Sequence, residues 1–387
     1  MTTQIIVMNL NGVAVASDTA VSRRAHGGAR PVGFESKMIQ LPAPHKLVLM
    51  HSGTVTLNGV PHLMQAQAWV NSLTRPLPTV RAYVDHYLRW SATEKRVIPP
   101  ESSGYAINPI VGRLFTQFQT EVQIIERQVA DLPDLEPAAR KRERNKRVTA
   151  KIAELRKYYA GLDNYKGLTR AAVVTANKKF MKGHAEFFDG LFEYTPLTAG
   201  HKKAMLELTH DALLKDEWTD SISSLVFVGF GTTEPYARTI RLNTQGIYAG
   251  KLVGTTADRK PIDAKNKHPK VDAYLIAQDD AMQTFFTGYH PQTNERVSQA
   301  VLEHLGDKIN EPAVKGSVDD AVKHAVEVGL NRVGDDQAQP VWDSLKFRSV
   351  SDLADFAEAM LKIQTLSSRM RGDATAGGQI ELISLTA

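Results

Sequence analysis

The chain has 387 residues, of which 42% are hydrophobic and 23% charged, proportions that exclude a collagen-like or wholly disordered protein. It contains no run of 18 apolar residues, which excludes a transmembrane helix, and its first residues lack the pattern of a signal peptide, so we expect a cytoplasmic protein with no membrane partner. The absence of cysteine excludes disulfides, thiolate metal sites and a cysteine nucleophile.

The net charge of +5 comes from one segment. Residues 140–157 contain nine Lys or Arg against Glu143 and Glu154, a net of +7, which leaves −2 for the rest of the chain. Glu143 precedes Arg147 by four residues, a spacing that predicts a solvated amphipathic helix. A nearly neutral chain with one basic helix argues against nucleic acid as a partner.

The first 55 residues predict β structure. Asn11-Gly12 suits a tight turn between two strands, and the Gly-rich stretch from Arg23 to Gly33 predicts a loop. Parallel strands need crossovers of a dozen or more residues, so strands this close together cannot form an all-parallel sheet. The expected strands span residues 4–8, 13–17, 38–41 and 47–50.

A helical region follows, and then the strands return. Helices are expected over 63–73, 80–90, 110–132, 137–159 and 199–214; strands over 224–230, 237–242, 247–253, 273–277 and 282–286; helices over 294–305, 318–329 and 350–368; and a last strand over 379–385. This order predicts an α+β fold in which two antiparallel sheets carry helices on their outer faces, a four-layer αββα sandwich.

The chemistry suggested by Thr2 depends on the removal of Met1. Removal of the methionine leaves a threonine with both a hydroxyl and a free α-amine. An α-amine titrates near pH 7.7 to 8.0, so it is a usable general base at neutral pH, and a threonine hydroxyl needs such a base beside it. Many inert proteins also begin Met-Thr, so further residues must support this interpretation.

Those residues follow at informative spacings. Asp18 lies sixteen residues after Thr2, Lys37 directly precedes an expected strand, and Ser52-Gly53 ends the next one. Three later segments contribute to the same sequence pattern: 227–231, 240–246 and 371–380. The pattern resembles the proteasome β-subunit family of N-terminal-nucleophile (Ntn) hydrolases, which includes the bacterial HslV and Anbu proteins.

The resemblance implies a threonine-type peptidase or amidohydrolase without a cofactor. In such an enzyme Thr2 Oγ attacks the amide carbonyl, Lys37 is the neighbouring cation, and Asp18 holds Lys37 in place. The Gly53 N–H faces the oxyanion and Asp373 orients the Thr2 amine. Each residue also has a structural interpretation on its own, such as a turn glycine or a solvated lysine.

The resemblance further implies an Ntn core of residues 1–75 and 216–387. Residues 76–215 then form a helical region that includes an insertion with a basic helix at about 137–160. Family analogy implies self-assembly into rings or stacked rings, with peptide or amide as substrate, and the sequence names no ATPase or other regulator.

Two departures from the family pattern affect the expected site. Ala376 stands where the family has a serine, and the segment 287–290 has no clear counterpart of the family's Gly-Ser-Gly turn, although Thr287 or Tyr289 could replace its serine. Two alternatives therefore stay open: an Ntn amidase for a small amide, and a catalytically silent structural or binding protein. The scattered histidines show no metal-ligand spacing, so we expect no metal.

Overall fold

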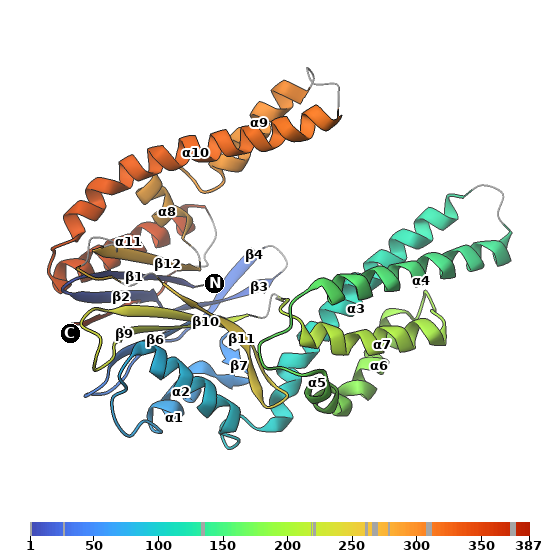
Figure 1. Ribbon diagram of the computed structural model, residues 1–387, viewed down its shortest axis with the longest axis horizontal. Coiled ribbons are helices and arrows are strands. Elements are labelled where there is room, and N and C mark those ends of the chain that lie inside the picture. Colours follow the sequence, from blue (N-terminus) through green and yellow to red (C-terminus); the bar gives the residue numbers. More distant parts are fainter. Residues whose placement is uncertain are drawn as a thin grey trace.

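The structure is a computed structural model, which describes residues 2–25, 28–132, 136–217, 219, 222–259, 262–264, 270–277, 279–306, 312–371 and 377–387. It has an α+β fold in which two antiparallel sheets pack face to face (Figure 1). The first sheet has the order β12-β1-β2-β13, with strands Val271–Ala277, Thr3–Asn9, Gly12–Asp18 and Ile380–Leu385. The second has the order β11-β10-β9-β6-β5, with strands Lys251–Asp258, Arg238–Tyr248, Ser223–Phe230, Lys46–Gly53 and Met38–Gln40.

Successive side chains of β1 and β2 point to opposite faces of their sheet. The apolar side chains on one face lie between the two sheets, and those on the other face lie beneath helices. Ile6 and Val15 face the second sheet, where they meet Val48 and Val226. Ile5 and its neighbours on the opposite face pack against helices α8 (Asp280–Thr287), α10 (Pro312–Leu345) and α11 (Val350–Met370). Because both faces of β1 are buried, its position is tightly determined.

Two helices cover the outer face of the second sheet. Helices α1 (His62–Val70) and α2 (Val80–Thr93) pack there around Trp69 and Phe227, whose rings meet edge to face with centroids 5.7 Å apart. The short strands β7 (Thr56–Leu57) and β8 (Val60–Pro61) lead into α1. Helix α2 belongs to the segment 76–215, yet it lies on the sheet.

The rest of that segment forms a helical projection with its own core (Figure 1). Its buried residues include Phe115, Phe118 and Phe188. The projection consists of η1 (Pro100–Ser103), α3 (Gly104–Ala130), α4 (Pro137–Gly161), α5 (Arg170–Asn177), η2 (Lys178–Phe180), α6 (Met181–Leu191) and α7 (Ala199–Leu214). Helix α9 (Thr293–Gly306) lies along α10 in a second projection.

The basic segment forms α4, as the sequence predicted, and its charges are paired across the helical projection. Arg147 contacts Glu143 one turn earlier, at 2.8 Å, and Arg144 contacts Glu126 of α3 at 2.7 Å. Lys151 lies 3.3 Å from Glu121 of α3. Carboxylates of α3 therefore neutralise two of the nine basic side chains, Arg144 and Lys151. None of the described helices is both long enough and apolar enough to cross a membrane.

Three predictions about local structure were wrong. The expected loop from Arg23 to Gly33 belongs to two paired strands, β3 (Ala20–Ala25) and β4 (Gly28–Phe34), which form a separate two-stranded sheet. A strand pair outside a larger sheet has less need of an alternating apolar face, which explains the missing sequence signal. The helices α5 and α6 were also not predicted.

The second error concerns residues 282–286, which form helix α8 and not a strand. Met282 and Phe286 are four residues apart and both buried, which is the spacing of one helical face. Gln364 of α11 accepts hydrogen bonds from the backbone N–H groups of Ala281 and Met282, at 2.8 and 3.4 Å, and so satisfies the start of the helix.

The third error concerns a turn. The sequence predicted separate strands over 237–242 and 247–253, but β10 continues to Tyr248 with a bulge between Thr244 and Gly246. The chain reverses at Ala249-Gly250, both of which have positive φ. Gly246 is therefore a bulge residue within the strand.

Candidate active site

Thr2 lies immediately before β1, between the two sheets, and is 7% exposed. It borders a cavity of about 30 Å³ that Lys37 and Gly53 also line. The structure therefore brings three of the five residues predicted from the sequence to one small space, because β1, the segment before β5 and the end of β6 meet there. A volume of this size holds about one water molecule.

Asp18, at the end of β2, is the fourth predicted residue, and it lies behind Lys37. Its Oδ1 accepts hydrogen bonds from the Lys37 ammonium at 2.7 Å and from the Thr3 N–H at 2.8 Å. Its Oδ2 accepts one from the Gly377 N–H at 3.1 Å. The carboxylate is fully buried and thereby ties the start of β1, the approach to β5 and the approach to β13 together.

Lys37 is a buried cation in this arrangement, with 3% of its surface exposed. Burial lowers the pKa of its ammonium, and this effect outweighs the opposing attraction of Asp18. The Nζ atom also donates to the Ala20 carbonyl at 2.7 Å. Two of its three donors thus have acceptors among the described residues, and the side chain borders the cavity beside Thr2.

Gly53 ends β6 in a backbone conformation that requires glycine. Its φ is +87°, and a Cβ added there would lie 2.1 Å from the Ile222 carbonyl oxygen. Any other residue would push β6 away from the start of β9. The close approach explains the glycine and keeps this wall of the cavity free of side chains.

The fifth predicted residue, Asp373, lies outside the described residues, as does Ala376. Thr287 and Tyr289 are described, and neither lines the cavity beside Thr2. The Thr287 hydroxyl lies 2.9 Å from the Gln283 carbonyl, one turn earlier in α8. This hydroxyl is therefore hydrogen-bonded within the last turn of α8.

Two stacked histidines at the cavity were not predicted. His51 of β6 lines the cavity, and its ring stacks on His62 of α1 with centroids 5.0 Å apart. His62 Nε2 lies 3.1 Å from the Ser223 hydroxyl, which also hydrogen-bonds to Thr54. The available sequence signal was the position of His51, directly before Ser52-Gly53.

Burial keeps both rings neutral at pH 7. It lowers the pKa of His51 to about 4, and Lys37 contributes a smaller effect in the same direction. It lowers the pKa of His62 to about 3, with a further contribution from His51 itself. A second positive charge in this space would be costly because Lys37 already supplies one.

Glu35 is a further residue of the cavity wall that the sequence analysis did not single out. It lines the cavity beside Thr2 and also a neighbouring cavity of about 520 Å³, which contains Glu381 and Phe34. Glu35 and Lys37 are two residues apart in an extended segment, so they share a side of the chain, and this spacing could have identified Glu35. Within the described part of the chain, no three His, Asp or Glu side chains lie close enough to hold a metal ion.

No protein-family model and no curated protein matches the sequence. Among solved structures, the chain is similar to a Gly-1 mutant of Anbu from Hyphomicrobium sp. strain MC1, with 11% identity and a TM-score of 0.29, covering 99% of this chain and 81% of that one. It is also similar to Anbu, an ancestral β-subunit, from Yersinia bercovieri, with 9% identity and a TM-score of 0.27, covering 99% and 82%. At these scores we base the function on the side chains of the cavity.

Proposed function

We propose that the protein is an N-terminal threonine hydrolase that cleaves peptide or other amide bonds at Thr2 after removal of Met1. The observation that supports this most directly is the shared cavity of Thr2, Lys37 and Gly53, with Asp18 bonded to Lys37 from behind. A nucleophile, a cation and a glycine backbone in one small space are the parts that amide hydrolysis needs.

In the proposed reaction, Thr2 Oγ attacks the amide carbonyl and its own α-amine takes the proton through one water. The space beside Thr2 has room for that water. The C–N bond breaks as the amine leaves with a proton, and a second water releases the acyl group from Thr2 Oγ. The amine and hydroxyl of Thr2 then return to their starting state.

The other residues stabilise charge. Lys37 is the cation near the developing alkoxide, and its positive field also favours the neutral form of the Thr2 amine. The Gly53 N–H is the proposed oxyanion donor, for which one such bond is typically worth about 2.7–4 kcal/mol. Asp373 is proposed to orient the Thr2 amine, and residues 1–75 with 216–387 to form the Ntn core.

Charge near the cavity favours a basic side chain in the substrate. The 520 Å³ cavity that adjoins Thr2 through Glu35 also contains Glu381, and no Lys or Arg is among the described residues of its wall. We propose that this cavity takes the side chain of a Lys or Arg residue close to the cleaved bond. The Phe34 ring would pack against the aliphatic part of that side chain.

We also propose self-assembly of the chain into rings or stacked rings, with Thr2 facing the enclosed space. The two helical projections, α3–α7 and α9–α10, extend from different sides of the sandwich (Figure 1). They give the chain surfaces for contacts between copies. Native mass spectrometry would show the number of copies.

The decisive experiment is the intact mass of the purified protein, with and without a peptide epoxyketone, which needs a free α-amine and the adjacent hydroxyl to close its ring. We expect loss of Met1 and a single adduct, absent in Thr2→Ala and retained in Thr2→Ser. Thr3→Val is the matched control, since it removes the neighbouring hydroxyl and leaves Thr2 intact.

The alternatives give different results. Retention of Met1 with no adduct would contradict the hydrolase and favour a catalytically silent protein. Adduct formation with hydrolysis of small acylamides but not of peptides would favour the amidase. The small volume beside Thr2 is the observation that keeps the amidase open.

A further inference from the structure

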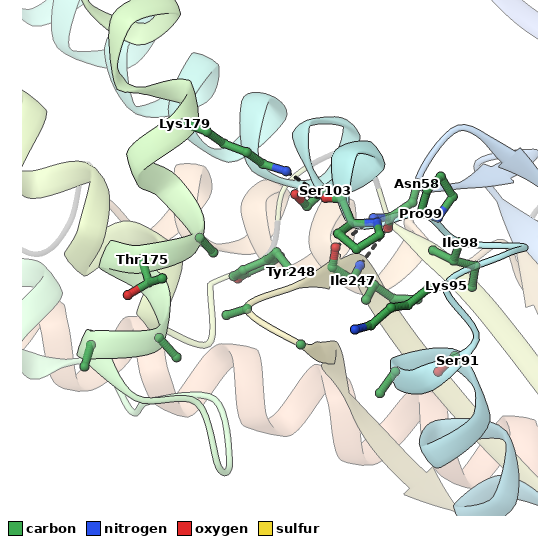
Figure 2. Close-up of a pocket in the computed structure, with 17 residues that line it drawn as sticks. Asn58, Ser91, Lys95, Ile98, Pro99, Ser103, Thr175, Lys179, Ile247 and Tyr248 are labelled. Carbon is green, nitrogen blue, oxygen red and sulfur yellow. Dashed lines mark hydrogen bonds between the residues drawn. The ribbon is translucent and has the colours of Figure 1, made fainter.

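A second cavity lies where the helical projection joins the sheet, and it is distinct from the one beside Thr2. Its volume is about 600 Å³, within the range of sites that bind small molecules. Its walls come from the segment after α2, from helix α5 and η2, and from the end of β10 with its turn (Figure 2). It therefore lies between two hydrophobic cores.

Small side chains keep this space open. Helix α5 presents Ala171, Ala172 and Ala176 to it, and the turn at Ala249-Gly250 adds no side chain larger than a methyl group. On its other side the helix is held against α7, where Asn177 donates a hydrogen bond to the Thr209 hydroxyl at 3.1 Å. The opening is thus built into the packing of the projection.

The uncharged polar groups of the wall are largely occupied by the protein. Asn58 pairs with both backbone groups of Ile247, at 2.7 Å each. Ser103 donates to the Pro100 carbonyl at 2.8 Å, Ser91 to the Leu88 carbonyl at 3.1 Å, and the Tyr248 hydroxyl to the Leu213 carbonyl at 2.7 Å. A ligand would meet mainly carbon atoms.

Two lysines are the exception. Lys95 and Lys179 line the cavity, and none of the described residues of its wall is Asp or Glu. Figure 2 shows the Lys95 side chain pointing across the cavity toward the helix that carries Thr175. Lys179 donates to the Pro100 carbonyl at 2.8 Å, and the structure shows no ion pair to a described carboxylate for either lysine. Among the described residues of the wall, their positive charge therefore has no counter-ion.

We propose that this cavity binds a small amphipathic carboxylate, whose apolar body lies among the alanines and prolines and whose carboxylate lies between Lys95 and Lys179. The volume of the cavity and its mainly apolar wall favour a ligand with an apolar part. The two ammonium groups favour a negatively charged end of that ligand over a neutral or positive one. The proposal does not depend on the hydrolase activity, because no residue of this wall lines the cavity beside Thr2.

The test uses the full chain and calorimetric titration with decanoate, decan-1-ol and decyltrimethylammonium below their micelle concentrations. We expect saturable binding of decanoate, binding of the alcohol at least about fivefold weaker, and none of the cation. The double variant Lys95→Ala/Lys179→Ala should bind decanoate about fivefold to tenfold more weakly, as expected for the loss of two exposed charge interactions. The matched control is Lys182→Ala, which removes an exposed lysine of α6 outside the cavity and should leave the affinity for decanoate unchanged.

A second variant tests the location. Ala176→Phe should abolish decanoate binding by filling the cavity, with folding checked by circular dichroism, and the double lysine variant gives an independent result if that protein does not fold. Equal binding of decanoate and the alcohol, no loss in the double variant, or no saturable binding would each overturn the proposal.

Discussion

The two cavities of this protein differ in how their polar groups are satisfied. Beside Thr2, the space is small, and the buried charges Asp18 and Lys37 are bonded to each other and to the backbone of three segments. At the base of the helical projection, the space is twenty times larger and mainly apolar, and Lys95 and Lys179 are exposed at its wall. The first cavity lies within the core of the two sheets, whereas the second lies between the core of the helical projection and the core beneath α1 and α2.

This difference predicts where stability and binding can be separated. A change to Asp18 or Lys37 should disturb the fold, because this buried pair also holds the backbone of neighbouring segments in place. A change in the wall of the larger cavity should alter ligand binding with little effect on folding.

The largest effect is expected for Asp18→Ala. Loss of the carboxylate leaves Lys37 buried without its ion-pair partner, so the free energy of unfolding should fall by about 3–5 kcal/mol in urea titrations. The control is Glu143→Ala, which removes the partner of Arg147 on the surface of α4 and should change the free energy of unfolding little, because solvent screens an exposed pair. Similar losses in both variants would contradict the contrast between buried and exposed pairs.

The stacked histidines should make stability depend on pH. Their pKa values in the folded protein, about 4 for His51 and about 3 for His62, lie below the value of about 6.5 expected when unfolded. The unfolded chain therefore takes up protons first as pH falls, so stability is full above pH 6.5 and declines below it, until the folded-state values are reached.

Between pH 7 and pH 5 this decline should amount to about 2 kcal/mol per histidine. Urea titrations at both pH values should show a correspondingly smaller decline in His51→Gln/His62→Gln. The exposed His324→Gln serves as the control and should decline like the unmodified protein. An unchanged decline in the double variant would show that these two rings do not carry the effect.

Gly53→Ala tests the wall of the small cavity. The added Cβ meets the Ile222 carbonyl and φ is positive, so we expect a loss of at least about 2 kcal/mol in unfolding free energy, together with loss of the epoxyketone adduct. Gly183→Ala is the matched control, because nothing lies within 4 Å of its added Cβ within helix α6. That variant should be neutral or more stable by up to about 1 kcal/mol.

The smallest effect is expected for Glu35→Gln. If the adjoining cavity takes a basic side chain, kcat/KM for substrates with Lys or Arg should fall about fivefold, or about 1 kcal/mol, while leucine substrates change little. Glu381→Gln should act in the same direction. Equal losses for basic and apolar substrates would contradict a role for Glu35 in specificity.

Local sequence patterns predicted much of the framework. The first two strands, the basic helix α4 and the last strand follow from apolar alternation, charge spacing and the Asn11-Gly12 turn. Residues 282–286 were assigned wrongly, because a short apolar run does not distinguish a strand from a buried helix. Helix α8 is decided by what it packs against, namely Gln364 and α11.

In the candidate site, too, some residues could be identified from the sequence and others only from the packing. Thr2, Asp18, Lys37 and Gly53 could be identified from the sequence because their spacing along the chain resembles a known pattern, and the structure brings them close together. His62 gave no such signal. It reaches the site only because α1 lies against the outer face of the second sheet, close to Ser223.

Local patterns in the chain predict a mixture of helices and antiparallel strands, the single basic helix, and Asp18 and Lys37 as candidate site residues. The burial of that pair, the stacking of two histidines close to it and the large cavity beside α5 follow from how distant segments pack. Alternation and charge spacing are local properties that a linear pattern records, whereas burial, pKa and empty space depend on segments that are distant in the chain and meet only after folding.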